Sequence, residues 1–249
     1  MKALILSAGL GTGLLPLTKE VPKVMIKVGG KPVLEHLIRL CVFHGIRDIA
    51  INLHYLPNII TEYLGDGLEF GANIVYFYER DKIMGGAGAI KQAYDYFKDD
   101  DFFVLNGDMV TNLDLKKMMK YHKLKKAVGT FLVHPTNHPY DSECVEFDKN
   151  FRITKIFRPK PGDRFKSISK SGAHIFSPSV FKYIPARVEF SLEHQLLPLL
   201  IKRNLSCFAY YSDEYSKDMG APERLKKARE DFEQGKIIPY YLSSKTDTK

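Results

Sequence analysis

The stretch Ala3-Leu4-Ile5-Leu6-Ser7-Ala8-Gly9-Leu10-Gly11-Thr12-Gly13 joins a short apolar run to a glycine-rich turn near the start of the chain. Residues 3–7 predict a buried strand, because a short apolar run that ends at a turn signal is typical of parallel sheets. Glycines after such a strand let backbone N–H groups approach a phosphate closely. The stretch therefore predicts a strand that leads into a phosphate-binding turn.

Two common phosphate-binding motifs do not fit this turn. Leu14 stands where a dinucleotide fingerprint needs its third glycine, and Pro16 disfavours the long helix that should follow at once. The second predicted strand ends at Asn52-Leu53-His54 and so lacks the acidic residue that binds a ribose. No Gly-Lys-Ser/Thr sequence follows the glycines, which excludes the ATPase-type loop.

Strand-like and helix-like segments alternate along the first half of the chain. Strands are predicted at 3–7, 48–53, 73–78, 102–105 and 128–133, and helices at 32–44, 58–64, 87–97 and 113–125. The second half predicts a hairpin over 144–147 and 152–157, strands at 173–176 and 205–211, and helices at 192–203 and 222–234. Pro198 should kink or split the helix that contains it. This order predicts an α/β fold: a Rossmann-like, mixed but mostly parallel sheet with helices on both faces.

Length and composition indicate one globular domain. The 249 residues are 45% hydrophobic and 27% charged, and no segment is rich enough in glycine, proline or serine to be a linker. We expect a single domain over residues 1–236 and a C-terminal tail over 237–249, with residues 243–249 frayed. The three cysteines form no disulfide or metal pattern, which favours a reduced, cytoplasmic setting.

The charge balance favours anionic partners. Lysine and arginine number 37 against 29 aspartates and glutamates, which gives a net charge of +8. The densest basic segment, residues 116–126, has helical spacing with Leu115, Met118, Met119 and Leu124 as a predicted buried stripe. We interpret its lysines as a solvated helix face. No nucleic-acid-binding module and no apolar run of membrane-spanning length accompany it, so neither nucleic acid nor membrane is an expected partner.

A longer pattern resembles the sugar-1-phosphate nucleotidyltransferase family, which shows Gly-x-Gly-Thr-Arg-Leu-x-Pro-x-Thr and then Pro-Lys. The matching residues here are Gly9 to Thr18, followed by Pro22-Lys23. Further segments resemble the family in the same order: Gly29 to His36, Gly85 to Ile90, Leu105-Asn106-Gly107-Asp108, Ser171-Gly172, Phe190 to Glu193, and Asp218 to Glu223. The resemblance covers about 220 residues.

The resemblance implies a reaction and a set of roles. A sugar-1-phosphate oxygen would attack the α-phosphate of a nucleoside triphosphate and release pyrophosphate. The implied nucleotide-binding residues are Leu6, Ala8, Gly9, Gly11, Thr12 and Gly85. Lys23 and Asp108 would be catalytic, and Asp108 and Asp218 would hold Mg²⁺, a hard cation that prefers carboxylate oxygens. The implied substrate-binding residues are Asn106, Lys160, Gly172 and Glu193.

Several of these residues have a simpler structural interpretation. Asn106-Gly107-Asp108 is also good turn chemistry, and Asp218 could cap the last helix. Glu193 lies where a helix begins, Lys160 lies in a polar loop, and Lys23 could be a surface lysine.

The pattern also breaks. Gly13 stands where the family has an arginine that neutralises the transferring phosphate, and Pro159 replaces a glutamate near the sugar-phosphate lysine. Lys19 or Arg80 could supply the missing charge, the chain could be a weakened relative that only binds nucleotide-sugar, or the change could be an isolated one.

The resemblance is greatest to mannose-1-phosphate or heptose-1-phosphate guanylyltransferases, so GTP is the favoured nucleotide. Uridylyl- and thymidylyltransferases stay open as alternatives. The oligomeric state is also open, and a homo-oligomer is one option. Nucleic-acid binding is a third class, and it rests on the basic charge balance alone.

Overall fold

The computed structural model describes residues 1–238 and divides the chain into two compact units. Unit 1 comprises Met1–Ile83, Leu105–Leu115 and Glu214–Lys249, and unit 2 comprises Met84–Val104 and Lys116–Asp213. The predicted C-terminal tail lies outside the described residues from position 239 onward, and so does the predicted frayed segment 243–249.

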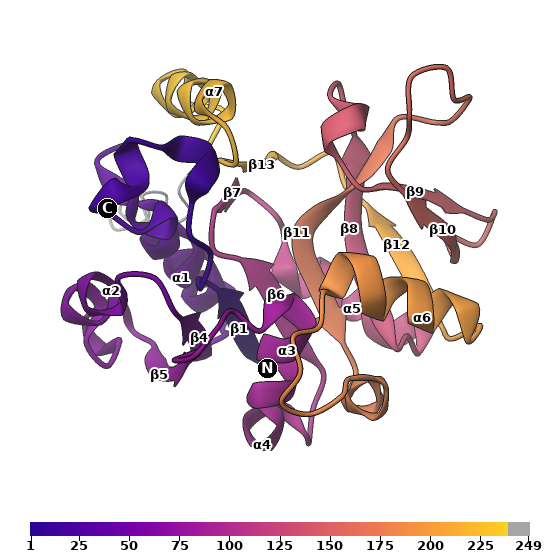
Figure 1. Ribbon diagram of the computed structural model, residues 1–249, viewed down its shortest axis with the longest axis horizontal. Helices are drawn as coiled ribbons and strands as arrows, with labels where there is room; N and C mark the ends of the chain where they lie inside the picture. Colours follow the sequence, from indigo (N-terminus) through magenta and orange to yellow (C-terminus); the bar gives the residue numbers. More distant parts are fainter. Residues whose placement is uncertain (239–249) are drawn as a thin grey trace, which may run out of the picture. The chain divides into compact units, whose positions relative to one another are not determined.

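The centre of unit 1 is a parallel sheet. Strand β1 (Lys2–Leu6) pairs with β4 (Asp48–Leu53), which pairs with β5 (Asn73–Tyr78) (Figure 1). On its other edge β1 is next to β6 (Phe102–Asn106), whose last two residues belong to unit 1. Ala3, Leu4 and Ile5 have no exposed surface, as expected for a strand covered on both faces. All three predicted strands are confirmed.

Two helices complete this layer of unit 1. Helix α1 (Val33–Phe43) lies between β1 and β4 in the sequence, and α2 (Pro57–Leu64) lies between β4 and β5. Gly45 follows α1 with a φ of 80°, and its N–H donates to the carbonyl of Val42, which is the usual glycine stop of a helix. The predicted helices at 32–44 and 58–64 are confirmed to within one residue at each end.

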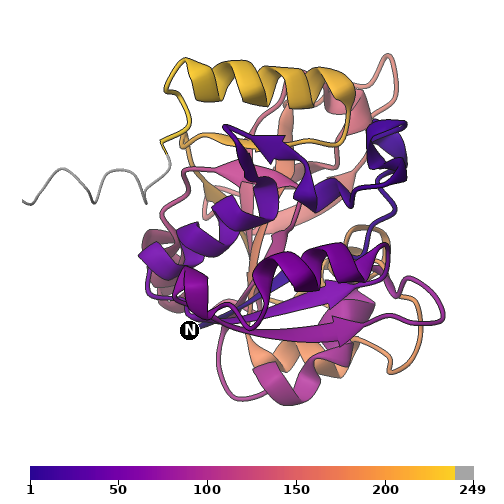
Figure 2. The ribbon, with the colours of Figure 1, turned by 90° about the vertical axis from the view of Figure 1, so that its left-hand side faces the viewer.

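Unit 1 also holds short elements that periodicity did not predict. Strand β7 (Met109–Thr111) pairs antiparallel with β13 (Ser216–Asp218), and β2 (Lys27–Val28) pairs with β3 (Lys31–Pro32). Helix α7 (Pro222–Glu233) contacts β13 and β2, and Figure 2 shows it above the β2–β3 hairpin.

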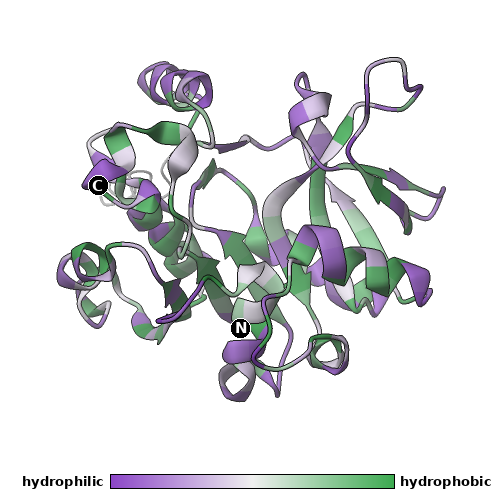
Figure 3. Cartoon of the chain, viewed as in Figure 1, coloured by the Kyte–Doolittle hydropathy of each residue, from purple (hydrophilic) through white to green (hydrophobic). Residues whose placement is uncertain are grey.

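Helix α7 is largely hydrophilic in Figure 3, and its buried apolar residues form one cluster with the first glycine turn. The cluster consists of Leu14, Ile26, Val28, Val33, Val110, Met219, Leu225, Ala228 and Ile237, with Tyr215 and Phe232 packed against it. Helix α7 and Ile237 therefore pack on the glycine turn through apolar contacts within unit 1.

Unit 2 is built on antiparallel pairs. Strand β11 (Ile168–Phe176) pairs with β8 (Gly129–Pro135) and with β9 (Cys144–Phe147), and β9 pairs with β10 (Ile153–Phe157). Strand β12 (Cys207–Tyr211) runs parallel to β8, and the first residues of β6 lie beside β11. The predicted hairpin and the strands near 128, 173 and 205 are confirmed, although β11 begins five residues earlier than expected.

The helices of unit 2 differ in detail from the prediction. The segment predicted at 87–97 is two helices, α3 (Gly85–Gln92) and α4 (Tyr94–Phe97). A π-helical turn (Leu192–Leu196) precedes α6 (Leu197–Lys202), so the helix is split beside Pro198 as predicted. In α5 (Leu115–Lys125), Leu115, Met118 and Met119 are buried, but the prediction for Leu124 is wrong because it is 78% exposed. Single-turn 3-10 helices cover Thr12–Leu14, Leu17–Lys19, Lys23–Met25, Leu68–Phe70 and Pro139–Asp141, and a longer one covers Pro178–Tyr183.

The predicted fold class is confirmed: a mixed, mostly parallel sheet with helices. No helix within residues 1–238 is long and apolar enough to cross a membrane. Cys41, Cys144 and Cys207 are all buried and form no disulfide. Burial raises the pKa of the Cys41 and Cys207 thiols to about 12, which keeps them protonated and unreactive.

The motif at the start of α1 has an architectural role. Glu35 is 1% exposed, and its carboxylate accepts from Lys31 Nζ and Arg39 Nε, each at 2.7 Å, and from the hydroxyl of Tyr63. Burial alone would raise the pKa of Glu35, but these three donors together lower it to about 2. The charged form of Glu35 therefore stabilises the fold.

We expect Glu35→Gln to lower the free energy of unfolding at pH 7 by roughly 2–3 kcal/mol, because the pKa of Glu35 falls from 4.5 to about 2 in the folded protein. A depressed pKa contributes stability above pH 4.5 that is lost as the pH falls toward 2. Urea unfolding at pH 7 and pH 3 should show a smaller difference between variant and wild type at pH 3. Glu62→Gln, an exposed change on α2, is the control.

Candidate active site

The first glycine turn begins where β1 ends, in unit 1. Gly11 has a φ of 69°, and a Cβ at this position would lie 2.9 Å from the Thr18 side chain, so the turn requires glycine there. The hydroxyl of Thr18 donates to the carbonyl of Gly11 at 2.8 Å and holds the turn. Gly9 has nothing within 4 Å of its hypothetical Cβ, so one side of the turn is open.

The backbone amides of this turn are available to a ligand. The N–H of Ser7 donates to Asn52 Oδ1 at 2.8 Å, and the N–H of Leu14 donates to the carbonyl of Gly11 at 3.0 Å. Between them, the amides of Gly9, Gly11 and Thr12 make no hydrogen bond to any other part of residues 1–238. Consecutive amides of this kind form an anion-binding concavity.

Lys23 and Asp108 form an ion pair beside the turn. Lys23 begins a 3-10 helix, and Asp108 follows β6 after a tight passage at Gly107. The N–H of Gly107 donates to the carbonyl of Leu6 at 2.8 Å, and a Cβ at position 107 would lie 2.7 Å from that oxygen. Glycine at 107 thus lets the strand end containing Asp108 lie directly against the end of β1. Each side chain of the pair is 20% exposed, so both ends are accessible from solvent.

The β7–β13 pairing brings the two predicted metal ligands together. Asp218 is directly opposite Met109 in the antiparallel register, and the N–H of Met219 donates to the carbonyl of Asp108 at 2.9 Å. Oδ1 of Asp218 accepts from the N–H of Gly220 at 2.8 Å and lies 3.0 Å from Nε of Arg224. Asp218 therefore does not cap α7, whose N-cap residue is Ala221.

The donors at this point suit a hard cation. Asp108 and Asp218 offer carboxylate oxygens from adjacent backbone positions, and their side chains are 20% and 43% exposed. No group of three or more His, Cys, Asp or Glu side chains within residues 1–238 could enclose a metal. Two carboxylates with open coordination positions match Mg²⁺, which usually keeps waters and binds substrate phosphates.

The space beside Gly13 that a side chain would need is occupied by the backbone of Gly220. A Cβ on Gly13 would be too close to the carbonyl oxygen of Gly220 for van der Waals contact. The arginine that the family carries here does not fit this loop conformation. The cations in contact with the two carboxylates, among the described residues, are Lys23 and Arg224. The predicted substitutes Lys19 and Arg80 are exposed and are not part of these pairs.

Gly85, in unit 2, is required by the chain's own backbone. It has a φ of 72°, and a Cβ there would lie 2.7 Å from the carbonyl oxygen of Phe190. That carbonyl accepts from the amides of Ala87 and Gly88, and the N–H of Phe190 donates to the carbonyl of Met84. The group that approaches Gly85 closely in the structure is thus the backbone of Phe190. Its role toward a nucleotide stays a prediction.

Glu193 belongs to a buried charge network that the sequence did not reveal. Lys170 is 4% exposed, and its ammonium donates to Glu193 Oε1 at 3.0 Å and contacts His174 Nε2 at 3.2 Å. Because an ammonium only donates, Nε2 of His174 must accept, which makes this ring neutral. Burial and the Lys170 charge both lower the pKa of His174 well below its usual value, in agreement with a neutral ring.

The charge on Glu193 depends on the same lysine. Burial raises the pKa of Glu193, but the Lys170 ammonium more than offsets this and leaves the pKa below its ordinary value. The simpler interpretation of Glu193 was that it lies at a helix start. The N-cap of that helical turn is Ser191, whose hydroxyl accepts from the N–H of His194 at 3.1 Å. Gly172 is buried in a register shift of β11 between Lys170 and His174, a kind of bulge that often re-aims side chains at sites.

The other predicted substrate residues are less constrained. Lys160 is exposed, and its backbone N–H donates to Asp163 Oδ2 at 2.7 Å in a polar turn. Asn106 is the half-buried last residue of β6. A cavity of about 310 Å³ in unit 2 has Glu193 in its wall, together with Phe157, Arg158, His194, Glu143 and Pro198.

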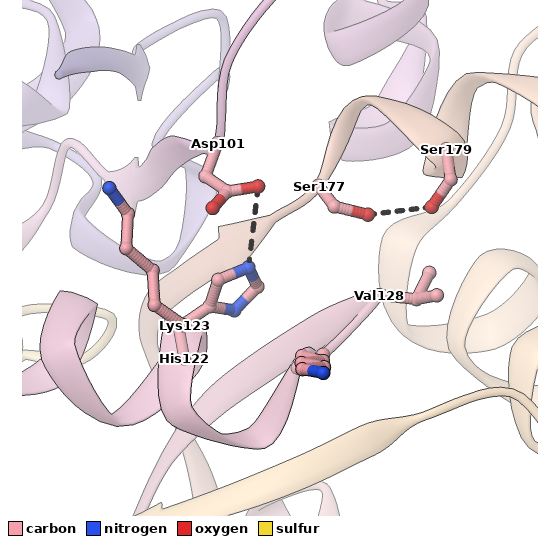
Figure 4. Close-up of a pocket in the computed structure, with 8 residues that line it drawn as sticks. Asp101, His122, Lys123, Val128, Ser177 and Ser179 are labelled. Carbon is pink, nitrogen blue, oxygen red and sulfur yellow. Dashed lines mark hydrogen bonds and ion pairs between the residues drawn. The ribbon is translucent and has the colours of Figure 1, made fainter.

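A second cavity of unit 2, of about 370 Å³, contains none of the predicted site residues (Figure 4). Its buried His122 lies 3.7 Å from Asp101 through Nε2 and 2.8 Å from the Thr130 hydroxyl through Nδ1. Ser177 and Ser179 bond to each other across the wall at 2.6 Å. The polar groups in the wall of this cavity thus contact one another.

Comparison with known proteins identifies the family of this chain. Residues 2–235 match the family described as Nucleotidyl transferase. The chain belongs to this family. It is 36% identical over 234 residues to a UTP–glucose-1-phosphate uridylyltransferase of Synechocystis, covering 88% of this chain and 60% of that protein. It is 30% identical over 234 residues to the mannose-1-phosphate guanylyltransferase of Mycobacterium tuberculosis, covering 94% of this chain and 65% of that protein.

The chain thus spans about 60–65% of the length of these curated relatives. Among solved structures, HddC from Yersinia pseudotuberculosis complexed with GMP-PN superposes with a TM-score of 0.79 and 27% identity. That match covers 93% of this chain and 99% of the HddC chain. The fold and family are therefore those expected from the ordered motifs.

We expect Gly13→Ala to destabilise the protein by roughly 1–3 kcal/mol, because an added methyl group would meet the Gly220 carbonyl. Gly9→Ala, in the same turn, should leave stability unchanged, because nothing lies within 4 Å of its Cβ. Thermal or urea unfolding of both variants measures this. Equal stability of the two would show that the Gly13–Gly220 contact does not hold in solution.

We expect Lys170→Met to cost about 2 kcal/mol of unfolding free energy, because it leaves a partly buried carboxylate without its cation. The double variant Lys170→Met/Glu193→Gln should recover part of this loss. A double-mutant cycle by urea denaturation gives the coupling, and additive single-variant effects would contradict the ion pair.

Proposed function

We propose that this protein transfers a nucleotidyl group from a nucleoside triphosphate to a sugar-1-phosphate, with Mg²⁺. The products are a nucleotide-sugar and pyrophosphate. The observation that carries the proposal is the pairing of β7 with β13, which puts Asp218 at the end of β13 next to Asp108, the residue before β7. Lys23 lies beside Asp108, and the chain belongs to the nucleotidyl transferase family. This is the set of charges that a magnesium-bound triphosphate needs.

The glycine turn supports binding of the phosphates. Amides of Gly9, Gly11 and Thr12 would donate to phosphate oxygens, and the end of β1 at Leu6 and Ala8 would flank the base. Lys23 would move its ammonium from Asp108 toward the phosphates as a compact point charge. Such donors act mainly by orientation and charge neutralisation, because phosphoryl chemistry needs little covalent help from the protein.

The reaction has a simple balance. An oxygen of the sugar phosphate forms a bond to the α-phosphorus, while the bond from that phosphorus to the oxygen bridging to the β-phosphate breaks. The electron pair leaves with pyrophosphate, and no oxidant or reductant is involved. Mg²⁺ held by Asp108 and Asp218 would neutralise the phosphate oxygens as charge develops.

The carboxylate of Glu193 would accept hydrogen bonds from the hydroxyl groups of the sugar, because Lys170 keeps this carboxylate ionised. Gly172, in the bulge of β11, would leave room for the ring, and Asn106 and Lys160 would contact the sugar phosphate. We infer that these residues act within one domain over residues 1–236. We propose a cytoplasmic setting, which the three buried cysteines without a disulfide favour.

GTP is the nucleotide we favour. The similarity to a mannose-1-phosphate guanylyltransferase and to HddC with GMP-PN supports guanine, whereas the uridylyltransferase of Synechocystis supports uridine. A thermal-shift comparison of GTP, UTP, dTTP, CTP and ATP with Mg²⁺ decides between them, because a ligand that binds the native state raises the melting temperature.

A second function has one observation in its favour. The Gly220 carbonyl fills the place of the family arginine, so the chain could bind nucleotide-sugar without making it at a useful rate. Such a protein would be stabilised by the nucleotide-sugar and would release no pyrophosphate. A homo-oligomer is compatible with either function.

We expect pyrophosphate release when the protein is incubated with Mg²⁺, GTP and mannose-1-phosphate or a heptose-1-phosphate, and a loss of at least about 10²-fold in kcat for Asp108→Ala. Asp99→Ala, an exposed change, is the matched control. No release from the wild type with any sugar phosphate and nucleotide, combined with tight binding of nucleotide-sugar, would favour the second function.

A further inference from the structure

We propose that Asn52 is a positioning residue that fixes the start of the glycine turn predicted to bind the triphosphate. The inference rests on the proposed function and deepens it, because it adds a residue to the nucleotide side of the same site. The sequence marked Asn52 only as the place of a missing acidic residue. The proposal follows from two buried hydrogen bonds in unit 1, which join Asn52 to Ser7 and to Glu79.

These three residues lie where neighbouring parallel strands end. Strands β1, β4 and β5 are next to one another in the sheet (Figure 1). Ser7 directly follows β1, Glu79 directly follows β5, and Asn52 is the last residue but one of β4. In open α/β sheets, ligands bind beyond the carboxyl ends of the strands. All three residues are less than 5% exposed, so this edge of the sheet contains buried polar groups that need partners.

The side chain of Asn52 connects the three strand ends. Its Oδ1 accepts from the N–H of Ser7 at 2.8 Å, and its Nδ2 donates to Glu79 Oε1 at 2.7 Å. Since a backbone N–H can only donate, the oxygen of Asn52 must face Ser7, and this orientation points the NH₂ group toward Glu79. The backbone of Glu79 is itself held, because its N–H donates to the carbonyl of Leu53 at 2.8 Å.

The contact with Ser7 fixes the orientation of one peptide group. The carbonyl of Leu6 and the N–H of Ser7 belong to the same planar peptide unit, the last one before the turn. The carbonyl accepts from the N–H of Gly107, which follows β6, at 2.8 Å, while the N–H donates to Asn52 of β4. Because β6 and β4 are on opposite sides of β1, this peptide group is held from both sides.

The held peptide group sets the position of the amides that follow it. The amides of Gly9, Gly11 and Thr12 make no hydrogen bond to any other part of residues 1–238 and are the predicted phosphate donors. The far end of the turn is held by the Thr18 hydroxyl, which donates to the carbonyl of Gly11. Asn52 holds the near end. A displacement of about 1 Å in a binding group can cost about 10²-fold in rate, so a loosened start of the turn should weaken phosphate binding.

The competing interpretation is that Asn52 only satisfies a buried amide of the fold. Its loss would then lower the melting temperature but would leave the polyphosphate affinity of the folded protein unchanged. Asn52→Leu removes both hydrogen bonds without a change in charge. The exchange variant Asn52→Asp/Glu79→Gln restores them with donor and acceptor reversed, because the new carboxylate at position 52 can accept from the Ser7 N–H and from the new amide at position 79. It also keeps the net charge of the wild type.

The experiment compares the wild type, Asn52→Leu, the exchange variant and Asn58→Leu, an exposed change on α2 that serves as the control. Calorimetry measures binding of magnesium tripolyphosphate, a probe with the phosphates but no base. Thermal unfolding gives the folded fraction, and steady-state kinetics gives KM for each substrate.

We expect folded Asn52→Leu to bind magnesium tripolyphosphate about tenfold more weakly or worse. Its KM for the nucleoside triphosphate should rise by a similar factor, and its KM for the sugar-1-phosphate should change much less. The exchange variant should recover most of the affinity, and Asn58→Leu should match the wild type.

Equal tripolyphosphate affinity in folded Asn52→Leu and in Asn58→Leu overturns the proposal. If Asn52→Leu does not fold, the exchange variant decides: an affinity within about tenfold of the wild type supports the proposal, and a weaker affinity or a failure to fold overturns it. If the wild type binds magnesium tripolyphosphate but releases no pyrophosphate from substrates, the proposed transferase function fails, and the affinity comparison still decides the role of Asn52. A wild type that binds no tripolyphosphate removes both.

Discussion

The antiparallel pairing of β7 with β13 is the constraint on which the site depends. It places Asp218 opposite Met109 and binds the amide of Met219 to the carbonyl of Asp108, so two acidic side chains far apart in the sequence share one edge. Val110 of β7 belongs to the same buried apolar cluster as Met219 and Leu225, and this packing stabilises the strand pair. Backbone hydrogen bonds and burial therefore bring together two like charges that would otherwise repel.

That repulsion is offset by ion pairs, which recur at several packed carboxylates of the described residues. Lys23 contacts Asp108, Arg224 contacts Asp218, Lys170 contacts Glu193, and Glu35 accepts from both Lys31 and Arg39. The two kinds of pair differ in exposure. Glu35 and Lys170 are almost fully covered, so their pairs are fixed parts of the fold, whereas the side chains of Lys23 and Arg224 are about one-fifth exposed.

The sequence predicted the elements that carry strong periodicity and missed those that depend on distant partners. Strands β4 and β5 have the predicted bounds because apolar runs of six residues bounded by turn signals are sufficient evidence for a strand. Strands β7 and β13 have three residues each, too few for a pattern, and each exists only through the other. Lys170 was missed for the same reason, since its partner Glu193 lies on another element, and helical spacing wrongly placed Leu124 inside.

The glycines of the site were predicted to make room for a ligand, but most of them make room for the chain's own backbone. Gly85 and Gly107 approach backbone carbonyls of the chain itself, at Phe190 and Leu6, so their lack of a side chain is first a packing requirement. Gly9 faces open space, so its missing side chain leaves room for a ligand. Gly13 belongs to the first kind. The Gly220 carbonyl occupies its side-chain space, and the N–H of Gly220 is bound to Asp218, so glycine at position 13 is a packing requirement of the Asp218–Gly220 turn.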